Sequence, residues 1–200
     1  MNGLLYDLEV ALLERRIFGK LRAELLSPLG GTIVDVGAGT GPNLPYFQPG
    51  ASVIALEPDR SMARRLQAKL TRAHVKIDVR VDDDTALDRI EERSVDAVLS
   101  MLLLCMVADP LATLRRMMRV LKPSGTLVVM EHVRSPGKMG KLQDVIAPAW
   151  RALADGCNLN RDTKAAIAAA GFDVRHLRTE QIVKIAPIQY LLHGNATLSN

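Results

Sequence analysis

Short apolar runs alternate with amphipathic segments along most of the chain. An alternating run at 75–81 has the pattern of a strand, as do four runs rich in Val, Ile and Leu, at 32–36, 52–56, 95–100 and 126–131. Between them, 61–73 and 111–121 place apolar residues three or four positions apart, as on one face of a helix. Because solidly apolar strands separated by helices form parallel sheets, the pattern predicts a doubly wound, Rossmann-like α/β fold. Its sheet would be mostly parallel, with helices on both faces.

The two ends of the chain depart from this alternation. Residues 4–26 predict an amphipathic helix, which would form a helical cap over 1–30. After the fifth strand, 132–160 is expected to be a lid-like insertion. The remaining elements are helices at 141–153 and 161–170, the second capped by Asn160, and strands at 172–177 and 188–192. The whole chain, 1–200, is therefore predicted to be one domain with a seven-stranded sheet.

The composition is that of an ordinary globular protein, with 48% hydrophobic and 24% charged residues. Cys105 and Cys157 stand far apart in sequence, and no Cys/His group has the short spacing of a zinc site. We therefore expect neither a disulfide nor a metal, and we expect both cysteines to be packing residues. No signal peptide is evident, and the longest apolar stretch, 97–108, is too short to span a bilayer. A reducing, cytoplasmic location is expected.

Charge is unevenly distributed along the chain. Residues 1–100 carry 13 basic and 15 acidic groups, whereas 101–200 carry 13 basic and 7 acidic groups. A basic second half suits an anionic partner such as a phospholipid surface, so peripheral contact with a membrane is one expectation. The aromatic residues are scattered and no dense Lys/Arg run occurs, which argues against a nucleic-acid partner.

The most informative segment is the glycine-rich loop at 37–41, which follows the first predicted strand. Glycines at alternate positions let a ligand approach the backbone closely because no Cβ intervenes. Glu57 ends the second strand, where a carboxylate can accept both hydroxyls of a ribose. One carboxylate of the acidic run 82–84, after the third strand, can accept from an adenine amino group. Together these features predict a nucleoside-binding site.

Other nucleotide-binding families are excluded by particular residues. The dinucleotide fingerprint requires a sixth-position glycine, where this chain has Pro42. No tyrosine has a lysine four residues later, as short-chain dehydrogenases require, and no P-loop lysine is present.

The surviving pattern resembles the class I methyltransferases that use S-adenosylmethionine. Residues 35–41, 94–100 and 121–127 are similar to the family's first motif, fourth-strand motif and turn before strand five. The resemblance covers nearly the whole chain and implies S-adenosylmethionine as the cofactor, with Glu57 at the ribose and Asp83 at the adenine. The other residues that it implies at the cofactor are Asp35, Gly37, Ala38, Gly39, Gly41, Asn43, Pro58, Met62, Asp84, Ser100 and Met101.

A narrower resemblance concerns the methyl acceptor. Residues 103–107, 130–133 and 155–163 are similar to the methyltransferase-like 7 group, whose best understood members methylate alkyl thiols. This resemblance implies S-methylation of a small, lipophilic acceptor. The membrane-anchoring N-terminal segment of the animal members has no counterpart here, so a soluble, bacterial-type enzyme is expected.

Few side chains are candidates for a direct role in methyl transfer. His132, at the end of the fifth strand, is the best-placed base, with structural hydrogen bonding as its alternative role. Tyr6 and Asp7 would close over the cofactor, as the N-terminal Tyr-Asp pair of related methyltransferases does. The expected acceptor wall is mostly apolar and consists of Tyr6, Met101, Leu102, His132 and Trp150 on the 141–153 helix.

Two alternatives stay open. Related small enzymes methylate phosphatidylethanolamine or quinone precursors, so the acceptor could instead be a phospholipid or another N- or O-nucleophile. A protein of a different class, a non-catalytic S-adenosylmethionine-binding or membrane-surface module, would keep the nucleoside site without turnover. A screen of acceptors distinguishes these alternatives.

Overall fold

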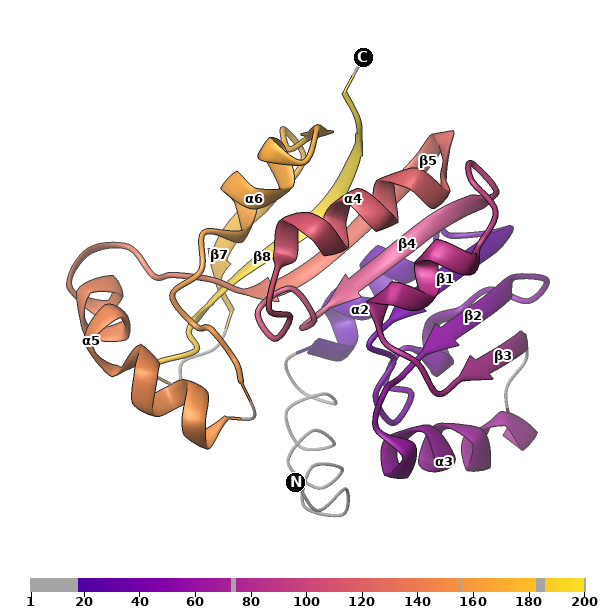
Figure 1. Ribbon diagram of the computed structural model, residues 1–200, viewed down its shortest axis with the longest axis horizontal. Helices are drawn as coiled ribbons and strands as arrows, with labels where there is room; N and C mark the ends of the chain where they lie inside the picture. The colour runs from indigo at the N-terminus through magenta and orange to yellow at the C-terminus, as the bar shows by residue number, and fades with distance from the viewer. Residues whose placement is uncertain (1–17, 73–74, 155, 183–185, 200) are drawn as a thin grey trace.

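The computed structural model describes residues 18–72, 75–154, 156–182 and 186–199. Its centre is an eight-stranded sheet of order β3-β2-β1-β4-β5-β8-β6, with β7 also paired to β8 (Figure 1). The strands are β1 (Thr32–Val36), β2 (Ser52–Leu56), β3 (Lys76–Arg80), β4 (Val95–Met101), β5 (Leu121–His132), β6 (Phe172–Asp173), β7 (Arg178–Gln181) and β8 (Tyr190–Leu198). All pairings from β3 to β5 are parallel, so the predicted α/β class and mostly parallel sheet are confirmed.

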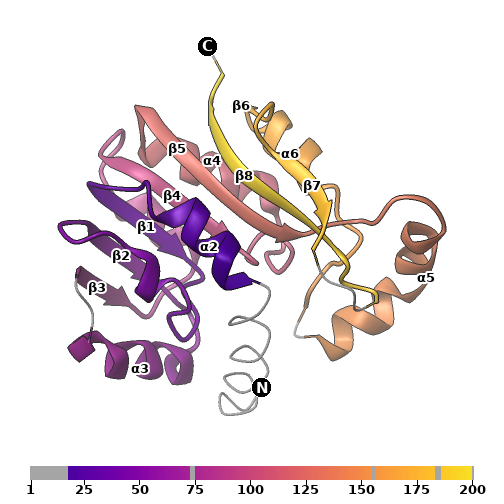
Figure 2. The same cartoon turned by 180° about the vertical axis from the view of Figure 1, so that it is seen from behind.

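Helices cover both faces of this sheet. They are α2 (Gly19–Leu26), α3 (Arg60–Lys69), α4 (Pro110–Val120), α5 (Gly137–Leu153) and α6 (Thr163–Ala169), with 3-10 turns η2 (Leu44–Tyr46), η3 (Leu70–Arg72) and η4 (Asp84–Arg89). Figure 1 shows α4 and α6 in front of the sheet, and Figure 2 shows α2 on the opposite face. Helix α5 stands away from the sheet in both views.

The core lies on both faces because side chains alternate along each strand. On β5, Leu127 and Val129 pack with α4 and α6 residues, whereas Val128 and Met130 pack with α2 residues. All four side chains are fully buried, as expected of central strands in a doubly covered sheet.

The predicted strand count of seven is wrong by one. Strand β7 has the sequence RTEQ and all four residues are exposed, so no hydrophobic period marks it. It forms because β8 offers an open antiparallel edge. Strand β8 runs antiparallel to β5, β6 and β7. It extends to Leu198, beyond the end of the predicted strand at 188–192. Strand β6 covers only two residues of the predicted strand at 172–177.

Two predicted helices need correction. Helix α6 begins at Thr163, and its cap is Asp162, which accepts a hydrogen bond from the Ala165 amide at 3.0 Å. The expected cap, Asn160, instead donates its side-chain amide to Asp144. Helix α5 begins at Gly137, four residues earlier than predicted, and leaves Leu142 46% exposed.

Other expectations lie partly or wholly outside the structure as described. Of the predicted helix at 4–26, only α2 falls within the described residues. Among the described residues, no helix is long and apolar enough to cross a membrane.

Candidate active site

The candidate site lies where β1, β4 and β5 end side by side. Val36, the last residue of β1, is in register with Ser100 on β4, and Met101 is in register with Met130 on β5. In open α/β sheets, ligands bind at the edge formed by the loops that follow the carboxyl ends of the parallel strands. The glycine loop, the loop after β4 and His132 therefore share one edge.

The glycine loop has a backbone that other residues would strain. Gly37 and Gly41 have φ values of +72° and +83°. A Cβ on Gly37 would lie 2.9 Å from Cδ1 of Leu103, and one on Gly41 would lie 2.6 Å from Cδ1 of Leu66. The loop is tied to the next strand because the amides of Gly37 and Ala38 both donate to the Leu56 carbonyl. The positive φ values favour glycine at both positions, and a side chain there would also have to displace a leucine methyl.

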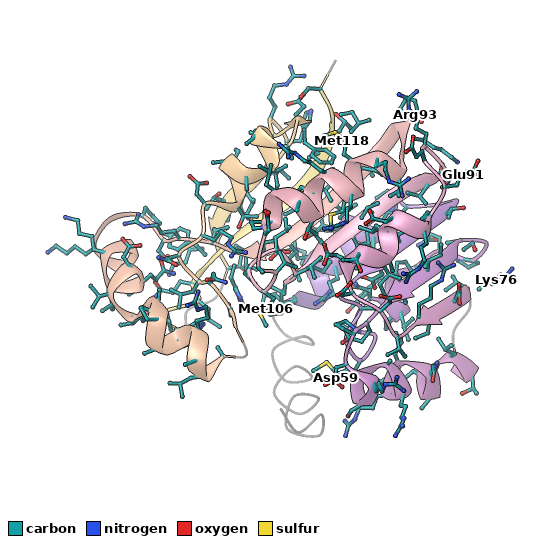
Figure 3. The ribbon with its side chains drawn as sticks, in the orientation of Figure 1. Asp59, Lys76, Glu91, Arg93, Met106 and Met118 are labelled. Atoms are coloured by element: carbon teal, nitrogen blue, oxygen red, sulfur yellow. The ribbon has the colours of Figure 1, made fainter. Side chains whose placement is uncertain are left out.

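Glu57 lies directly beside this loop. Its carboxylate accepts hydrogen bonds from the amides of Gly39 and Asp59, each at 2.8 Å. Asp59 in turn caps α3, at whose start Figure 3 shows it. Burial raises the pKa of Glu57, and the two amide bonds partly oppose that rise. Each carboxylate oxygen has only one of these bonds, so the group has capacity to accept from a further donor such as a ribose hydroxyl.

Asp35 belongs to a buried series of hydrogen-bonded side chains. Asn43 donates its side-chain amide to both Asp35 oxygens, at 3.0 and 2.8 Å, and Arg22 donates to the Asn43 carbonyl oxygen. Burial, the largest influence, raises the pKa of Asp35 to about 6, although the Asn43 bond and Arg22 lower it. These hydrogen-bonded side chains connect α2, β1 and the glycine loop. The connection supports a positioning role for Asp35 and Asn43. Sequence patterns did not single out Arg22, because arginine on an amphipathic helix reads as a surface residue.

The two aspartates expected near the adenine have different settings. Asp83 is exposed and accepts from the amide and hydroxyl of Thr85, which lower its pKa. Asp84 is paired with helix α4, through the Thr113 hydroxyl at 2.7 Å and the Arg116 guanidinium at 3.1 Å. Asp83 is therefore the one that stays accessible to a ligand.

Glu131 organises the loop that follows β4. This fully buried carboxylate accepts from the Ser100 hydroxyl at 2.7 Å and from the amides of Leu103, Leu104 and Cys105 at 2.8, 2.8 and 3.2 Å. Desolvation raises its pKa, and the four bonds oppose the rise. The sequence patterns do not predict this role of Glu131, because its partners lie about 30 residues away in the chain. The hydroxyl of Ser100, an expected cofactor residue, is thus engaged inside the protein.

The same loop carries a strained residue. Leu102 has a φ of +63°, a conformation that costs a residue with a Cβ about 1–2 kcal/mol. Its amide donates to the Met130 carbonyl at 2.7 Å, which holds the loop across the end of β5. Such strain is concentrated at functional sites.

Two cysteines and a histidine that stand far apart in sequence lie together in the structure. Cys105, His132 and Cys157 converge, with one potential ligand atom from each residue within 4.8 Å of the others. Both cysteines are buried and unpaired by disulfide. A hydrogen bond with Cys105 lowers the pKa of Cys157 to about 5, with smaller contributions from His132 and Trp150, and raises that of Cys105.

The remaining expected site residues are distributed as follows. Pro58 is exposed and Met62 half-buried at the start of α3, whereas Met101 is 6% exposed at the end of β4. Tyr6 and Asp7 lie outside the described residues. A surface cavity of about 550 Å³ lies near Pro123 and Leu198, at the opposite end of β5, and contains none of the expected site residues.

The residues at the carboxyl edge fit an adenosyl ligand. A nearly buried carboxylate with free acceptor capacity lies next to a loop in which added Cβ atoms would clash. An exposed aspartate follows the third strand of the same sheet. This donor and acceptor set is what a ribose and an adenine require.

Comparisons with known proteins agree with this fit. The family model described as "Methyltransferase domain" matches residues 34–129. Thiol S-methyltransferase TMT1A of Homo sapiens is 31% identical over 193 residues, covering 94% of this chain and 77% of that protein. Thiol S-methyltransferase TMT1B of Homo sapiens is 28% identical over 190 residues, covering 92% and 77%.

Solved structures share the fold. A putative methyltransferase of Haloferax volcanii, solved in complex with the Trm112 methyltransferase activator, superposes with a TM-score of 0.68 at 20% identity. The match covers 98% of this chain and 96% of that one.

Proposed function

This chain belongs to the S-adenosylmethionine-dependent methyltransferases, and we propose that it methylates the sulfur of small, lipophilic thiols. The observation that carries the choice of acceptor is the 31% identity, over 94% of the chain, to a human thiol S-methyltransferase. The side chains at the carboxyl edge support it, because those after β4 are largely apolar.

The residues of this chain mainly bind and position the reactants. S-adenosylmethionine supplies a methyl group that is already activated by its sulfonium charge. In the proposal, Glu57 accepts the ribose hydroxyls, Asp83 accepts from the adenine, and the 37–41 loop allows close backbone approach. The Asp35–Asn43 pair and Glu131 hold the two loops rigid, which fixes the reacting groups relative to one another.

A thiol needs only to lose its proton, because the thiolate is the nucleophile. His132, at the end of β5, has a buried Nε2 without a hydrogen-bond partner. The buried Met101 and the half-buried Leu102 place apolar side chains at the same edge, and Trp150 of α5 packs against the two cysteines. An apolar wall would favour lipophilic acceptors by removing their chains from water.

The proposal includes a cytoplasmic protein that touches membrane surfaces. Helix α5 exposes Val145 and Leu153, at 78% and 85%, and its first turns carry Lys138 and Lys141. Apolar and cationic side chains together suit the interface of an anionic bilayer, where lipophilic thiols also partition.

A homologous series of straight-chain alkyl thiols tests the acceptor, with S-adenosylhomocysteine as the measured product. Each added methylene should raise kcat/KM about fourfold until the site is full, since burial of one methylene contributes about 0.8 kcal/mol. Trp150→Ala should flatten this slope and leave S-adenosylmethionine affinity nearly unchanged. Leu142→Ala, at a leucine of the same helix that is 46% exposed, is the matched control and should leave the slope intact.

Other outcomes point to the alternatives. Faster turnover of a small charged acceptor, with rates falling for each methylene, would contradict the lipophilic site. Transfer to phosphatidylethanolamine vesicles or to phenols instead of thiols would favour an N- or O-methyltransferase. Binding of S-adenosylmethionine without transfer to any of these acceptors would favour a non-catalytic module.

A further inference from the structure

The group formed by Cys105, His132 and Cys157 has the composition of a metal site. Two thiols and an imidazole lie within 4.8 Å of one another, and no other such group of three occurs in the described part of the chain. Thiolate and imidazole are the ligands that Zn²⁺ prefers, and tetrahedral coordination at ordinary bond lengths separates two sulfurs by about 3.8 Å. The three side chains therefore need only a small inward adjustment to bind one ion.

The segments that carry these ligands are fastened to one another. The backbone and side-chain amides of Asn158 both donate to the Cys105 carbonyl, at 2.7 and 3.1 Å. The Arg161 guanidinium donates to the carbonyls of Leu104 and Val107 on the same loop. These bonds hold Cys157 against Cys105, whereas His132 is placed by its β5 pairing with β8. The ligand geometry thus rests on hydrogen bonds outside the three side chains, as in well-built metal sites.

Packing alone does not account for His132. Its Nε2 is buried without a hydrogen-bond partner, which in an apolar setting costs about 1–3 kcal/mol. Trp150 packs against the two cysteines, and its buried Nε1 makes no conventional hydrogen bond and has the Cys157 sulfur as its polar neighbour. A metal bound to the imidazole and a further sulfur near the indole N–H would satisfy both groups.

The group lies next to the cofactor edge. His132 is two residues beyond Met130, which is paired with Met101, and β4 borders β1 and its glycine loop. Cys105 is in the loop after β4, where Figure 3 shows the neighbouring Met106 on the side toward α5. An ion bound here would therefore lie at the same edge of the sheet as the residues expected at the cofactor.

We propose that Cys105, His132 and Cys157 bind one Zn²⁺ ion and leave its fourth position open for the acceptor thiol. Three protein ligands with one open position is the arrangement of catalytic rather than structural zinc sites. The zinc site does not depend on the proposed function, whereas the identity of the fourth ligand rests on it.

The acceptor thiol binds the ion and releases its proton to water, because a thiol coordinated to zinc is deprotonated. The sulfur then uses a lone pair to form a bond to the methyl carbon of S-adenosylmethionine. The bond from that carbon to the sulfonium sulfur breaks, and its electron pair stays on that sulfur to give S-adenosylhomocysteine. The thioether product has no negative charge, binds the ion weakly and leaves.

Cobalt binding to the full-length chain tests the site. Metal-free protein, prepared with a chelator under reducing conditions, is titrated with Co²⁺. One equivalent should give thiolate-to-cobalt charge-transfer absorption and the ligand-field bands of a tetrahedral site, and one equivalent of Zn²⁺ should abolish both. Cys105→Ser, Cys157→Ser and His132→Gln should each weaken Zn²⁺ binding by on the order of a hundredfold or more. His176→Gln, at an exposed histidine, is the matched control and should bind normally.

The number of metal ions bound per wild-type chain is measured as well, so the test does not depend on whether a variant folds. Absence of tight binding of one Co²⁺ or Zn²⁺ per wild-type chain would overturn the metal site, as would normal binding by folded variants that bind S-adenosylhomocysteine.

Addition of hexanethiol to the Co²⁺ protein, without cofactor, tests the fourth ligand. Its charge-transfer band should intensify, and an unchanged spectrum would overturn the thiol half of the proposal. A protein that binds Zn²⁺ at these residues but methylates no thiol would refute the proposed function and leave the zinc site standing.

Discussion

Three buried carboxylates at the sheet edge differ in what they bind. Asp35 is satisfied by Asn43, and Glu131 by one hydroxyl and three amides. Glu57 has only two amide partners and remains 6% exposed. Asp35 also accepts only two bonds, but Glu57 is the more exposed of the two and lies against the glycine loop, so Glu57 is the one of the three placed to accept from a ligand.

Glu57→Ala should weaken binding of S-adenosylmethionine by tens-fold to a hundredfold, or about 2–3 kcal/mol, because two ribose hydroxyls lose their acceptor. Isothermal titration calorimetry measures the dissociation constant. Glu24→Ala, on the exposed side of α2, is the control and should bind as wild type does. NAD should not bind either protein, and an unchanged dissociation constant in Glu57→Ala would remove Glu57 from the site.

At the scale of elements, loops rather than strands carry most of the site. The loop after β4 has three consecutive amides, of Leu103, Leu104 and Cys105, directed at Glu131 on the neighbouring strand. Helix α5 is attached by Gln143, which accepts from the Ser135 amide and donates to the Pro187 carbonyl. Long-range polar anchors of this kind let a loop keep one conformation without a hydrophobic core of its own.

Glu131→Gln should lower the free energy of unfolding by about 1–3 kcal/mol, because one acceptor oxygen is replaced by an NH₂ group that faces donors. Glu131→Ala should cost about 3 kcal/mol or more, since a buried hydroxyl and three amides lose their acceptor. Urea denaturation measures both values. Glu91→Gln is a surface control, shown in Figure 3, and should stay within about 0.5 kcal/mol of wild type. Equal stability of Glu131→Gln and Glu91→Gln would refute the anchoring role.

At the scale of the whole molecule, ligand-binding groups gather at one end of the parallel strands. The residues expected at the cofactor lie at or just after the carboxyl ends of β1, β2, β3 and β4, which share an edge. The cavity near Pro123 lies at the opposite end of the sheet. Buried ionisable groups at the binding edge are expected to lower global stability at neutral pH, because their charged forms are poorly solvated.

Asp35 should make stability depend on pH. Its pKa is raised from 3.8 to about 6, so the stabilisation from its neutral form is present below pH 3.8 and lost as the pH rises through about 6. Relative to Asp35→Asn, the wild-type free energy of unfolding should fall by about 2 kcal/mol between pH 4.5 and 7.5. Denaturation of both proteins across this range measures the difference, in which other titrating groups cancel. A difference that is constant with pH would show that Asp35 titrates normally.

The amino-acid sequence alone determined those strands and loops whose signal lies in residues close together along the chain. Strands β1, β2, β4 and the buried part of β5 follow from local apolar runs, and the glycine loop and Glu57 follow from their positions after strands. These predictions succeed because periodicity and turn chemistry depend on residues a few positions apart.

Only the tertiary structure decided the rest. Strand β7 forms through pairing with β8 and has no apolar period of its own, and Arg22 is buried because it meets Asn43. Cys105, His132 and Cys157 come together because β5 pairs with β8 in one register and Asn158 bonds to the loop after β4. Contacts between distant residues depend on the packing of whole elements, and no spacing along the chain records that packing.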